Sequence, residues 1–317
     1  MVSVVIPAYR VALYIAATLD SVLAQTFKDY EIIVVNDGSP DTAALEKVLT
    51  PYQDRIIYLR QENQGLAGAR NTGIRAARGK YIAPLDADDT WAPEHLATQL
   101  TVLESDPSID IVYADARIFG DAPEAGRTLM ELSPSAGEVT FERLVTRQCV
   151  VHVCVTVCRR QTLLCAGLFD PSLRRLEDID MWLRVAIQGG RIAYQRRVLG
   201  YYRRHAASLS ADKVAMLETF LDVLAKASRD PRLTAAQREV VERQCATERI
   251  SLELQKGKRA FLAGDAEAAT SHLARANAQH KSVKLAAVLM LLRIAPGFLL
   301  MLYQWRDRHV YKLKTQS

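Results

Sequence analysis

Three acidic residues lie within four positions of the chain, at Asp86, Asp88 and Asp89. They directly follow Tyr81–Leu85, an apolar run with the composition of a buried strand. Carboxylates crowded at a strand end repel one another unless a cation or a hydrogen-bond network compensates their charge. Oxygen ligands of this kind bind hard divalent cations such as Mg²⁺ or Mn²⁺, which stabilise a departing diphosphate. A second interpretation is a capping cluster for a helix that begins near Trp91, with Asp89 as the cap.

A second acidic pair, Glu177 and Asp178, begins a stretch with helical periodicity over Glu177–Gln188. The N-terminus of a helix favours an ionised carboxylate. An ionised Asp178 can accept the proton of a hydroxyl group as its oxygen attacks. Simple capping of the helix is the alternative interpretation.

Asp37 follows another apolar run, Glu31–Asn36. A carboxylate at this point can accept a hydrogen bond from the ring N–H of a pyrimidine, and Gly38 lets the backbone approach a ligand closely. The residues Asn36–Ser39 are equally suited to a plain turn. Both interpretations stay open on the sequence alone.

Alternating strands and helices are predicted to position these polar segments. The apolar runs Val2–Pro7, Glu31–Asn36, Ile56–Leu59 and Tyr81–Leu85 indicate strands, and Gly68–Ala77 a helix. Strands that are apolar on both faces and alternate with helices indicate a parallel sheet covered on both sides, with ligands at the carboxyl ends of the strands. Farther along, we expect strands over Ile111–Phe119 and Val150–Cys158, helices over Trp91–Glu104 and Glu177–Gln188, a loop over residues 120–137, and paired short strands over Arg191–Arg203.

The last third of the chain has a different composition. Residues 211–280 are rich in Ala, Leu, Glu, Arg and Gln, which predicts helices throughout, separated once at Gly264. Residues 283–303 are almost continuously apolar but are interrupted by Arg293 and Pro296, so the uninterrupted runs are too short to span a membrane. A helix lying at a membrane surface fits this pattern, and a core helix of a C-terminal bundle is the alternative.

The net charge of the chain is +5, and the basic surplus lies within residues 281–317. The rest is therefore nearly neutral, which argues against a nucleic-acid partner and points to an anionic membrane surface for the tail. The five cysteines are an odd number, and residues 1–6 do not have the pattern of a secretory leader. We therefore expect reduced thiols and a cytoplasmic location.

Four segments, in their order and spacing, resemble the family 2 glycosyltransferases: Val2–Tyr9, Val34–Ser39, Asn63–Gly73 and Gly79–Asp89. Two further segments are similar to the Glu-Asp motif and the closing segment of that family: Leu176–Arg184 and Tyr201–Ser210. The resemblance covers residues 1–210. It implies a GT-A fold, which is a mostly parallel, Rossmann-like α/β sheet flanked by helices, and an inverting transfer of a sugar from a nucleotide-diphosphate sugar to a hydroxyl group.

The resemblance also implies roles for individual residues. The sugar donor would be a nucleotide sugar, with a UDP-sugar favoured. Its nucleoside would be bound by Pro7, Ala8, Tyr9 and Asp37. Arg70 would lie near the diphosphate, and Asp86 would contact the ribose or a metal-bound water. Asp88 and His205 would ligate Mn²⁺ or Mg²⁺. Asp178 would be the catalytic base, with Glu177 as the second candidate for that role.

We therefore predict a glycosyltransferase domain over residues 1–210, a helical extension over 211–280 and a basic, apolar tail over 281–317. The expected acceptor is a glycan or lipid-linked molecule in bacterial surface polysaccharide or glycolipid assembly. The expected location is peripheral, at the inner face of the cell membrane. Two other functions remain as alternatives, namely a catalytically silent nucleotide-sugar-binding scaffold and a nucleotidyltransferase on a related sheet. The latter enzymes usually carry a Gly-rich, basic loop after the first strand, and Pro7–Arg10 lacks its glycines.

Overall fold

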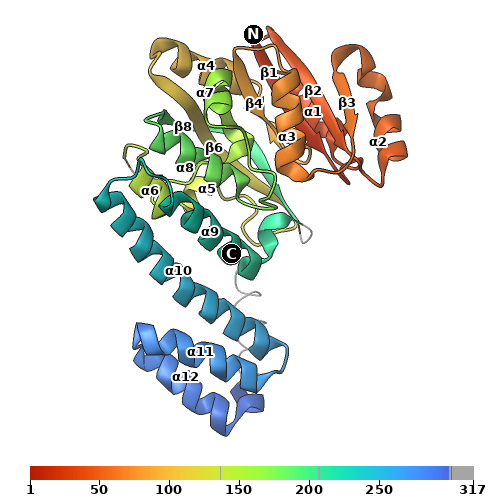
Figure 1. Ribbon diagram of the computed structural model, residues 1–317. Coiled ribbons are helices and arrows are strands. Elements are labelled where there is room, and N and C mark those ends of the chain that lie inside the picture. Colours follow the sequence, from red (N-terminus) through yellow and green to blue (C-terminus); the bar gives the residue numbers. More distant parts are fainter. Residues whose placement is uncertain (136, 206–207, 300, 302–317) are drawn as a thin grey trace. The chain divides into compact units, whose positions relative to one another are not determined.

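The computed structural model of the protein describes residues 1–135, 137–205, 208–299 and 301. Its chain forms two compact units (Figure 1). The first comprises Met1–Ala211 and Val223–Val241, and the second comprises Asp212–Asp222 and the residues from Glu242 onward. The three-part division expected from the sequence stays a prediction. The contacts add that residues 223–241 pack with the first unit.

An eight-stranded sheet forms the centre of the first unit as far as the structure describes it. The strand order across the sheet is β3-β2-β1-β4-β7-β6-β8-β5. The strands are β1 (Val2–Ala8), β2 (Tyr30–Asp37), β3 (Ile57–Gln61), β4 (Tyr81–Pro84), β5 (Thr90–Trp91), β6 (Ile109–Gly120), β7 (Thr156–Arg159) and β8 (Arg191–Arg204).

The four strands predicted from the first ninety residues are confirmed and are parallel. Ala8 of β1 pairs with Asn36 of β2, and Val5 pairs with Pro84 of β4. Their carboxyl ends therefore lie at one edge of the sheet. β6 and β8 are also parallel, whereas β7 and β5 run antiparallel to their neighbours, so the complete sheet is mixed.

Helices cover both faces of the sheet. All seven residues of β1 are buried, as expected for a strand that is covered on both sides. One face packs against α1 (Ile15–Leu23), α2 (Thr42–Leu49) and α4 (His95–Ser105). On the other face α3 (Gly65–Ala76) contacts β1 and β2 so closely that Gly73 lies directly against Val5. Further helices of this unit are α5 (Leu129–Leu132), α6 (Phe141–Val145), α7 (Arg160–Cys165) and α8 (Glu177–Ile187).

Some predicted elements are wrong at their boundaries. Residues 150–158 were expected to form one strand, but only β7 is extended, and Val153–Val155 forms a 3₁₀ turn. Side chains take the carbonyl groups that a neighbouring strand would use: Trp91 Nε1 donates to Cys154 O at 2.6 Å, and Gln99 Nε2 donates to Val155 O at 2.9 Å.

Three further differences concern length and connection. The helix expected from Trp91 begins at His95, because Thr90–Trp91 pairs with β8. The segment Arg191–Arg203, expected as paired short strands, is the single strand β8 alongside β6. The expected loop over residues 120–137 contains the short helix α5, which begins with a capping box between Thr128 and Glu131.

The helical character predicted for residues 211–280 is confirmed. The helices are α9 (Lys213–Ser228), α10 (Ala235–Leu262), α11 (Ala266–His280) and α12 (Val283–Ile294). The break between α10 and α11 falls at Gly264, which adopts φ +82°. In the second unit, Leu292 of α12 packs with Phe261 and Leu273. Among the described residues, no helix is both long enough and apolar enough to cross a membrane.

Candidate active site

Arg70 lies at the centre of the site and joins the two acidic motifs. It is placed by α3, and its side chain is 1% exposed. Its Nη2 lies 2.5 Å from Asp86 Oδ1, and its Nη1 donates to Glu177 Oε1. The guanidinium group also lies over the ring of Phe169, with 5.5 Å to the centroid. One buried cation therefore links the acidic run to Glu177, which lies 107 residues after Arg70 in the sequence.

Asp88 faces His205 across the site. Asp88 follows β4, and His205 follows β8; Asp88 Oδ2 and His205 Nε2 are 3.4 Å apart. Both side chains are about a quarter exposed, at 26% and 25%. The ring of His205 stacks on Tyr14, with ring centroids 5.7 Å apart. The structure thus brings together the two residues that the sequence selected as metal ligands, and it adds Tyr14 as a support that the sequence did not reveal.

Asp89 is not a helix cap, contrary to one interpretation of the sequence. Helix α4 begins at His95 after Glu94, and Asp89 Oδ1 instead accepts the backbone N–H of Arg203 at 2.7 Å. Asp89 is 1% exposed. Burial, together with repulsion from Asp88 and Asp86, raises its pKa well above the usual range. Asp89 therefore ties the acidic run to β8.

Arg203, a residue of β8 that pairs with β6, is also part of the site. Its guanidinium group stacks over the rings of Phe119 and Tyr14, at 4.3 Å and 4.8 Å from the centroids. Its Nε donates to the backbone oxygen of Asp88 at 2.9 Å. The only signal in the sequence was the position of Arg203 two residues before His205.

Asp178 differs from its neighbour Glu177 in its surroundings. Glu177 is 4% exposed and is engaged by Arg70, whereas Asp178 Oδ1 accepts the N–H of Ile179 at 2.8 Å. Burial and repulsion from Glu177 raise the pKa of Asp178 to about 7, against the attraction of Arg70. Helix position alone predicts easy ionisation, but desolvation outweighs it here. A carboxylate that titrates near neutral pH is well matched to accepting a proton.

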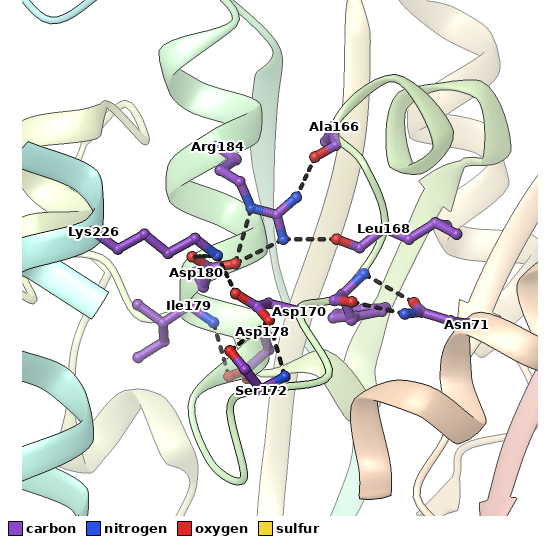
Figure 2. Close-up of polar contacts among 11 residues, drawn as sticks. Asn71, Ala166, Leu168, Asp170, Ser172, Asp178, Ile179, Asp180, Arg184 and Lys226 are labelled. Carbon is purple, nitrogen blue, oxygen red and sulfur yellow. Dashed lines mark hydrogen bonds and ion pairs between the residues drawn. The ribbon is translucent and has the colours of Figure 1, made fainter. Parts of the chain in front are cut away.

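The segment before α8 is fixed by several hydrogen bonds (Figure 2). Asn71, the neighbour of Arg70 on α3, donates to Phe169 O at 2.7 Å and accepts from Phe169 N at 2.9 Å. The chain then enters α8 through Leu176, which has φ +56° and lies in the left-handed region. Because such a backbone is unfavourable for a leucine, the surrounding contacts must hold it.

The residues expected to bind the nucleoside lie at the ends of β1 and β2. Pro7 and Ala8 are buried at the end of β1, and Tyr9 follows them with 42% of its side chain exposed. Asp37, at the end of β2, accepts hydrogen bonds on Oδ1 from Gln61 Nε2 at 2.7 Å and Gln64 N at 2.8 Å. Asp37 therefore orders the start of α3, and its predicted contact with a base stays a prediction.

The side-chain atoms of Asp88 and His205 fit a divalent cation that also binds a phosphate of the substrate. Within the described residues there is no cluster of three His, Cys, Asp or Glu arranged around a metal position. Asp88 and His205 nevertheless supply one oxygen and one nitrogen that converge. Burial, and then repulsion from Asp86, raises the pKa of Asp88, so positive charge is favoured beside it. Mg²⁺ and similar ions are commonly held by one or two protein ligands together with substrate phosphates.

Comparison with known proteins agrees with this arrangement. Residues 3–161 match the family described as Glycosyl transferase family 2. An uncharacterized glycosyltransferase of Rickettsia prowazekii is 32% identical over 228 residues, which are 70% of this chain and 70% of that protein. In Escherichia coli, the UDP-Glc:alpha-D-GlcNAc-diphosphoundecaprenol beta-1,3-glucosyltransferase WfgD is 30% identical over 233 residues, 73% of this chain and 88% of that protein. Longer relatives from Rickettsia felis and Rickettsia conorii are covered over 31% of their length.

Solved structures match the fold. S. aureus TarS 1-349 in complex with UDP-GlcNAc superimposes with a TM-score of 0.65 at 17% identity, over 97% of this chain and 91% of that chain. The mannosyltransferase PcManGT from Pyrobaculum calidifontis, in complex with GDP-Man and Mn²⁺, gives 0.62 at 22% identity, over 99% and 85%. The predicted GT-A fold with a helical C-terminal region is thereby confirmed. With its acidic run and its Glu-Asp pair joined by Arg70, this chain belongs to glycosyl transferase family 2.

Proposed function

We propose that this enzyme is a metal-dependent, inverting glycosyltransferase that moves a sugar from a UDP-sugar to a hydroxyl group of a lipid-linked glycan. The observation that carries the proposal is the ion pairing of Arg70 with both Asp86 and Glu177. This pairing puts the acidic run and the base candidate Asp178 around one centre, as a direct transfer between donor and acceptor requires.

In the proposed reaction Asp178 accepts the proton of the acceptor hydroxyl group. The acceptor oxygen forms a bond to the anomeric carbon while the bond from that carbon to the diphosphate oxygen breaks, and UDP leaves with the electron pair. Attack from the side opposite the leaving group inverts the configuration at the anomeric carbon. The part-buried position of Asp178 supports this role, because desolvation raises the pKa of its carboxyl group to about 7 and keeps it basic enough to take a proton near neutral pH.

Asp88 and His205 would hold Mn²⁺ or Mg²⁺, which when bound supplies positive charge to the departing diphosphate. The imidazole ligand favours Mn²⁺ over Mg²⁺, because Mg²⁺ prefers oxygen ligands. Arg203 adds a fixed positive charge beside Asp88, since its guanidinium group is held between Phe119 and Tyr14. Metal dependence, the choice of metal and the ligand roles are parts of this proposal.

The nucleoside would be bound where β1 and β2 end, by Pro7, Ala8, Tyr9 and Asp37. Uracil fits this assignment because its ring N–H can donate to the carboxylate of Asp37. A UDP-sugar donor and a diphosphoundecaprenol-linked acceptor are also named for the E. coli relative, which supports the same classes of substrate here. Arg70 would act near the diphosphate through Asp86, which it holds.

Peripheral membrane contact at the cytoplasmic face would bring the enzyme to a lipid-linked acceptor. Apolar side chains of α12 are exposed, with Val283 at 84%, Met290 at 64% and Ile294 at 68%. Lys281, Lys284 and Arg293 supply basic charge in the same stretch. Exposed apolar and basic side chains together favour an anionic lipid surface. The predicted tail continues into residues 302–317, which lie outside the described residues.

The donor and the base can be tested together. Thermal shifts with a panel of UDP- and GDP-sugars and Mn²⁺ should identify a UDP-sugar that stabilises the enzyme, because ligand binding to the folded state raises apparent stability. With that donor, the wild type should release UDP and form a product of inverted configuration, read by NMR. Asp178→Asn should keep donor affinity and lose transfer. Release of a sugar 1-phosphate in place of UDP would indicate nucleotidyl transfer instead, and binding without turnover would indicate a silent scaffold.

The membrane contact has its own test. The wild type should sediment with vesicles that contain phosphatidylglycerol and much less with vesicles of phosphatidylcholine alone. A Met290→Ser, Ile294→Ser double variant should lose this binding while keeping donor affinity. Equal sedimentation of variant and wild type would exclude α12 as the contact.

A further inference from the structure

Lys226 connects two carboxylates that lie on either side of the base candidate in the sequence. Its Nζ is 2.5 Å from Asp170 Oδ2 and 2.8 Å from Asp180 Oδ1 (Figure 2). Lys226 belongs to α9, in the part of that helix that packs with the first unit, where Val223 and Leu224 are buried. Its backbone is therefore anchored, and its ammonium group is presented from a fixed position.

On one side Lys226 holds the segment that lies under Arg70. Asp170 follows Phe169, whose ring underlies the Arg70 guanidinium group and whose backbone is bonded to Asn71. Asp170 Oδ1 accepts from both Ser172 N at 2.9 Å and Ser172 Oγ at 2.7 Å, which closes a turn. Lys226 therefore holds, through Asp170, the segment of the chain that precedes Asp178.

On the other side Lys226 holds the first turn of α8. Asp180 lies two residues after Asp178 and is 4% exposed. Its Oδ2 accepts from Arg184 Nε at 2.9 Å, and Arg184 Nη2 donates to Leu168 O at 2.7 Å. Arg184 thus ties α8 to the start of the segment, and Lys226 ties α8 to the Asp170 turn.

We propose that Lys226 is a positioning residue for glycosyl transfer: by bridging Asp170 and Asp180 it fixes the entry into α8 and thereby the direction of the Asp178 carboxylate. This proposal rests on the proposed role of Asp178 as the base. It adds a residue that lies beyond the segment matching the family, since that match ends at residue 161.

Electrostatics explains why a cation is needed at this point. The Oδ2 atom of Asp170 and the Oδ1 atom of Asp180 both contact the ammonium group of Lys226. Without that group, the two carboxylates would repel one another. Although burial opposes it, the hydrogen bond from Lys226 lowers the pKa of Asp170 to about 2, with help from Ser172. The carboxylate of Asp170 is thus ionised in the assembled turn. Separation of the two carboxylates would release Leu176 from its left-handed conformation and turn Asp178 away.

The test compares Lys226→Met, which keeps the length of the side chain without its charge, with Lys226→Arg, which keeps the charge. The assay is transfer from the donor that the wild type consumes in the panel of UDP- and GDP-sugars, with donor affinity measured by calorimetry in Mn²⁺. Lys226→Met should lower kcat by about ten- to a hundredfold, the range expected when a catalytic group is displaced by about 1 Å. Its donor Kd and donor KM should change less than about twofold. Lys226→Arg should recover most of kcat.

Lys256→Met is the matched control, because Lys256 also lies on a helix and is ion-paired, with Glu218 at 2.7 Å, but lies far from these motifs in the sequence. It should keep wild-type kcat. Two results would show that Lys226 has only a structural role. One is an equal kcat for Lys226→Met and the wild type. The other is a smaller amount of folded Lys226→Met enzyme whose folded fraction has the wild-type kcat. Transfer by Asp178→Asn at the wild-type rate would overturn the assignment of Asp178 as the base. Failure of that assignment can therefore be distinguished from failure of the positioning role of Lys226.

Discussion

The guanidinium group of Arg70 on α3 donates a hydrogen bond to the carboxylate of Glu177 at the start of α8. These two residues are 107 positions apart in the sequence. Because Arg70 also pairs with Asp86, a single side chain neutralises charge in both acidic segments. The positions of the donor-site carboxylates and of the Glu-Asp pair are therefore energetically linked. This linkage leads to the first prediction.

Arg70→Met should destabilise the protein strongly. It leaves Glu177 buried and Asp86 part-buried without their cation, and removing one partner of a buried ion pair costs about 3–5 kcal/mol. Urea unfolding followed by circular dichroism measures the change. Arg60→Met is the control, because Arg60 is 65% exposed and lies 3.9 Å from Glu46, so its loss should change stability by less than about 0.5 kcal/mol. Similar unfolding midpoints for both variants would contradict the central role of Arg70.

Activity and stability should respond to pH in opposite directions. The pKa of Asp178 is about 7 in the folded enzyme and near 3.8 in the unfolded chain, so folded Asp178 binds its proton more tightly between these values. Its contribution to stability is fully present below about pH 4 and is lost as pH rises through 7. The base form, and with it kcat/KM, increases over the same range.

The measurement is kcat/KM from pH 5 to 9 together with thermal unfolding at each pH. Asp178→Asn should remove the activity and flatten its part of the stability curve, because asparagine does not titrate. A wild-type profile that is flat between pH 5.5 and 8 would show that the raised pKa of Asp178 does not control the reaction.

Removal of divalent cations should weaken donor binding. Calorimetry of UDP with the wild type should show at least a tenfold higher Kd in EDTA than in Mn²⁺, because the diphosphate loses its counter-charge. Asp88→Ala should give the same Kd with and without Mn²⁺. His272→Gln serves as the control, since His272 pairs with Glu253 at 2.9 Å in the second unit. If Asp88→Ala kept the full response to Mn²⁺, Asp88 would not be a ligand.

Gly73→Ala should be destabilising because α3 lies directly on the sheet. An added Cβ at Gly73 would lie 2.4 Å from Val5 Cγ1 and 3.4 Å from Val35 Cγ2. Overpacking of this kind costs about 1–3 kcal/mol. Gly297→Ala has open space around its Cβ and should not destabilise. Combining Gly73→Ala with Val5→Ala should recover part of the loss, and an unaltered loss in the double variant would argue against this clash.

The sequence predicted the parts of the fold that depend on local pattern. Continuous apolar runs located β1, β2, β3 and β4, and the polar residues that follow them predicted the edge at which Asp88 lies. The strand expected around Cys154 failed because Trp91 and Gln99 take its carbonyl groups. Such contacts between distant side chains leave no periodic signal.

The same limit applies to the site. Asp88, His205 and the Glu-Asp pair were found because motif order marks them. The role of Asp89 was misjudged, because the pairing of β5 with β8, which brings Arg203 alongside, depends on the whole sheet. Lys226 was missed because its partner Asp170 lies 56 residues away and neither residue belongs to a recognisable motif.

The return of residues 223–241 to the first unit has a consequence for the order in which the protein is made. A chain grows from its N-terminus, and domains generally fold as units as they emerge. When residues 1–211 have been synthesised, the sheet, Asp88, Asp178 and His205 are all present, but the cation that bridges Asp170 and Asp180 is not. The nascent chain would therefore contain its motifs before the bridge that positions Asp178, and we expect the full rate of turnover only after α9 has left the ribosome and docked.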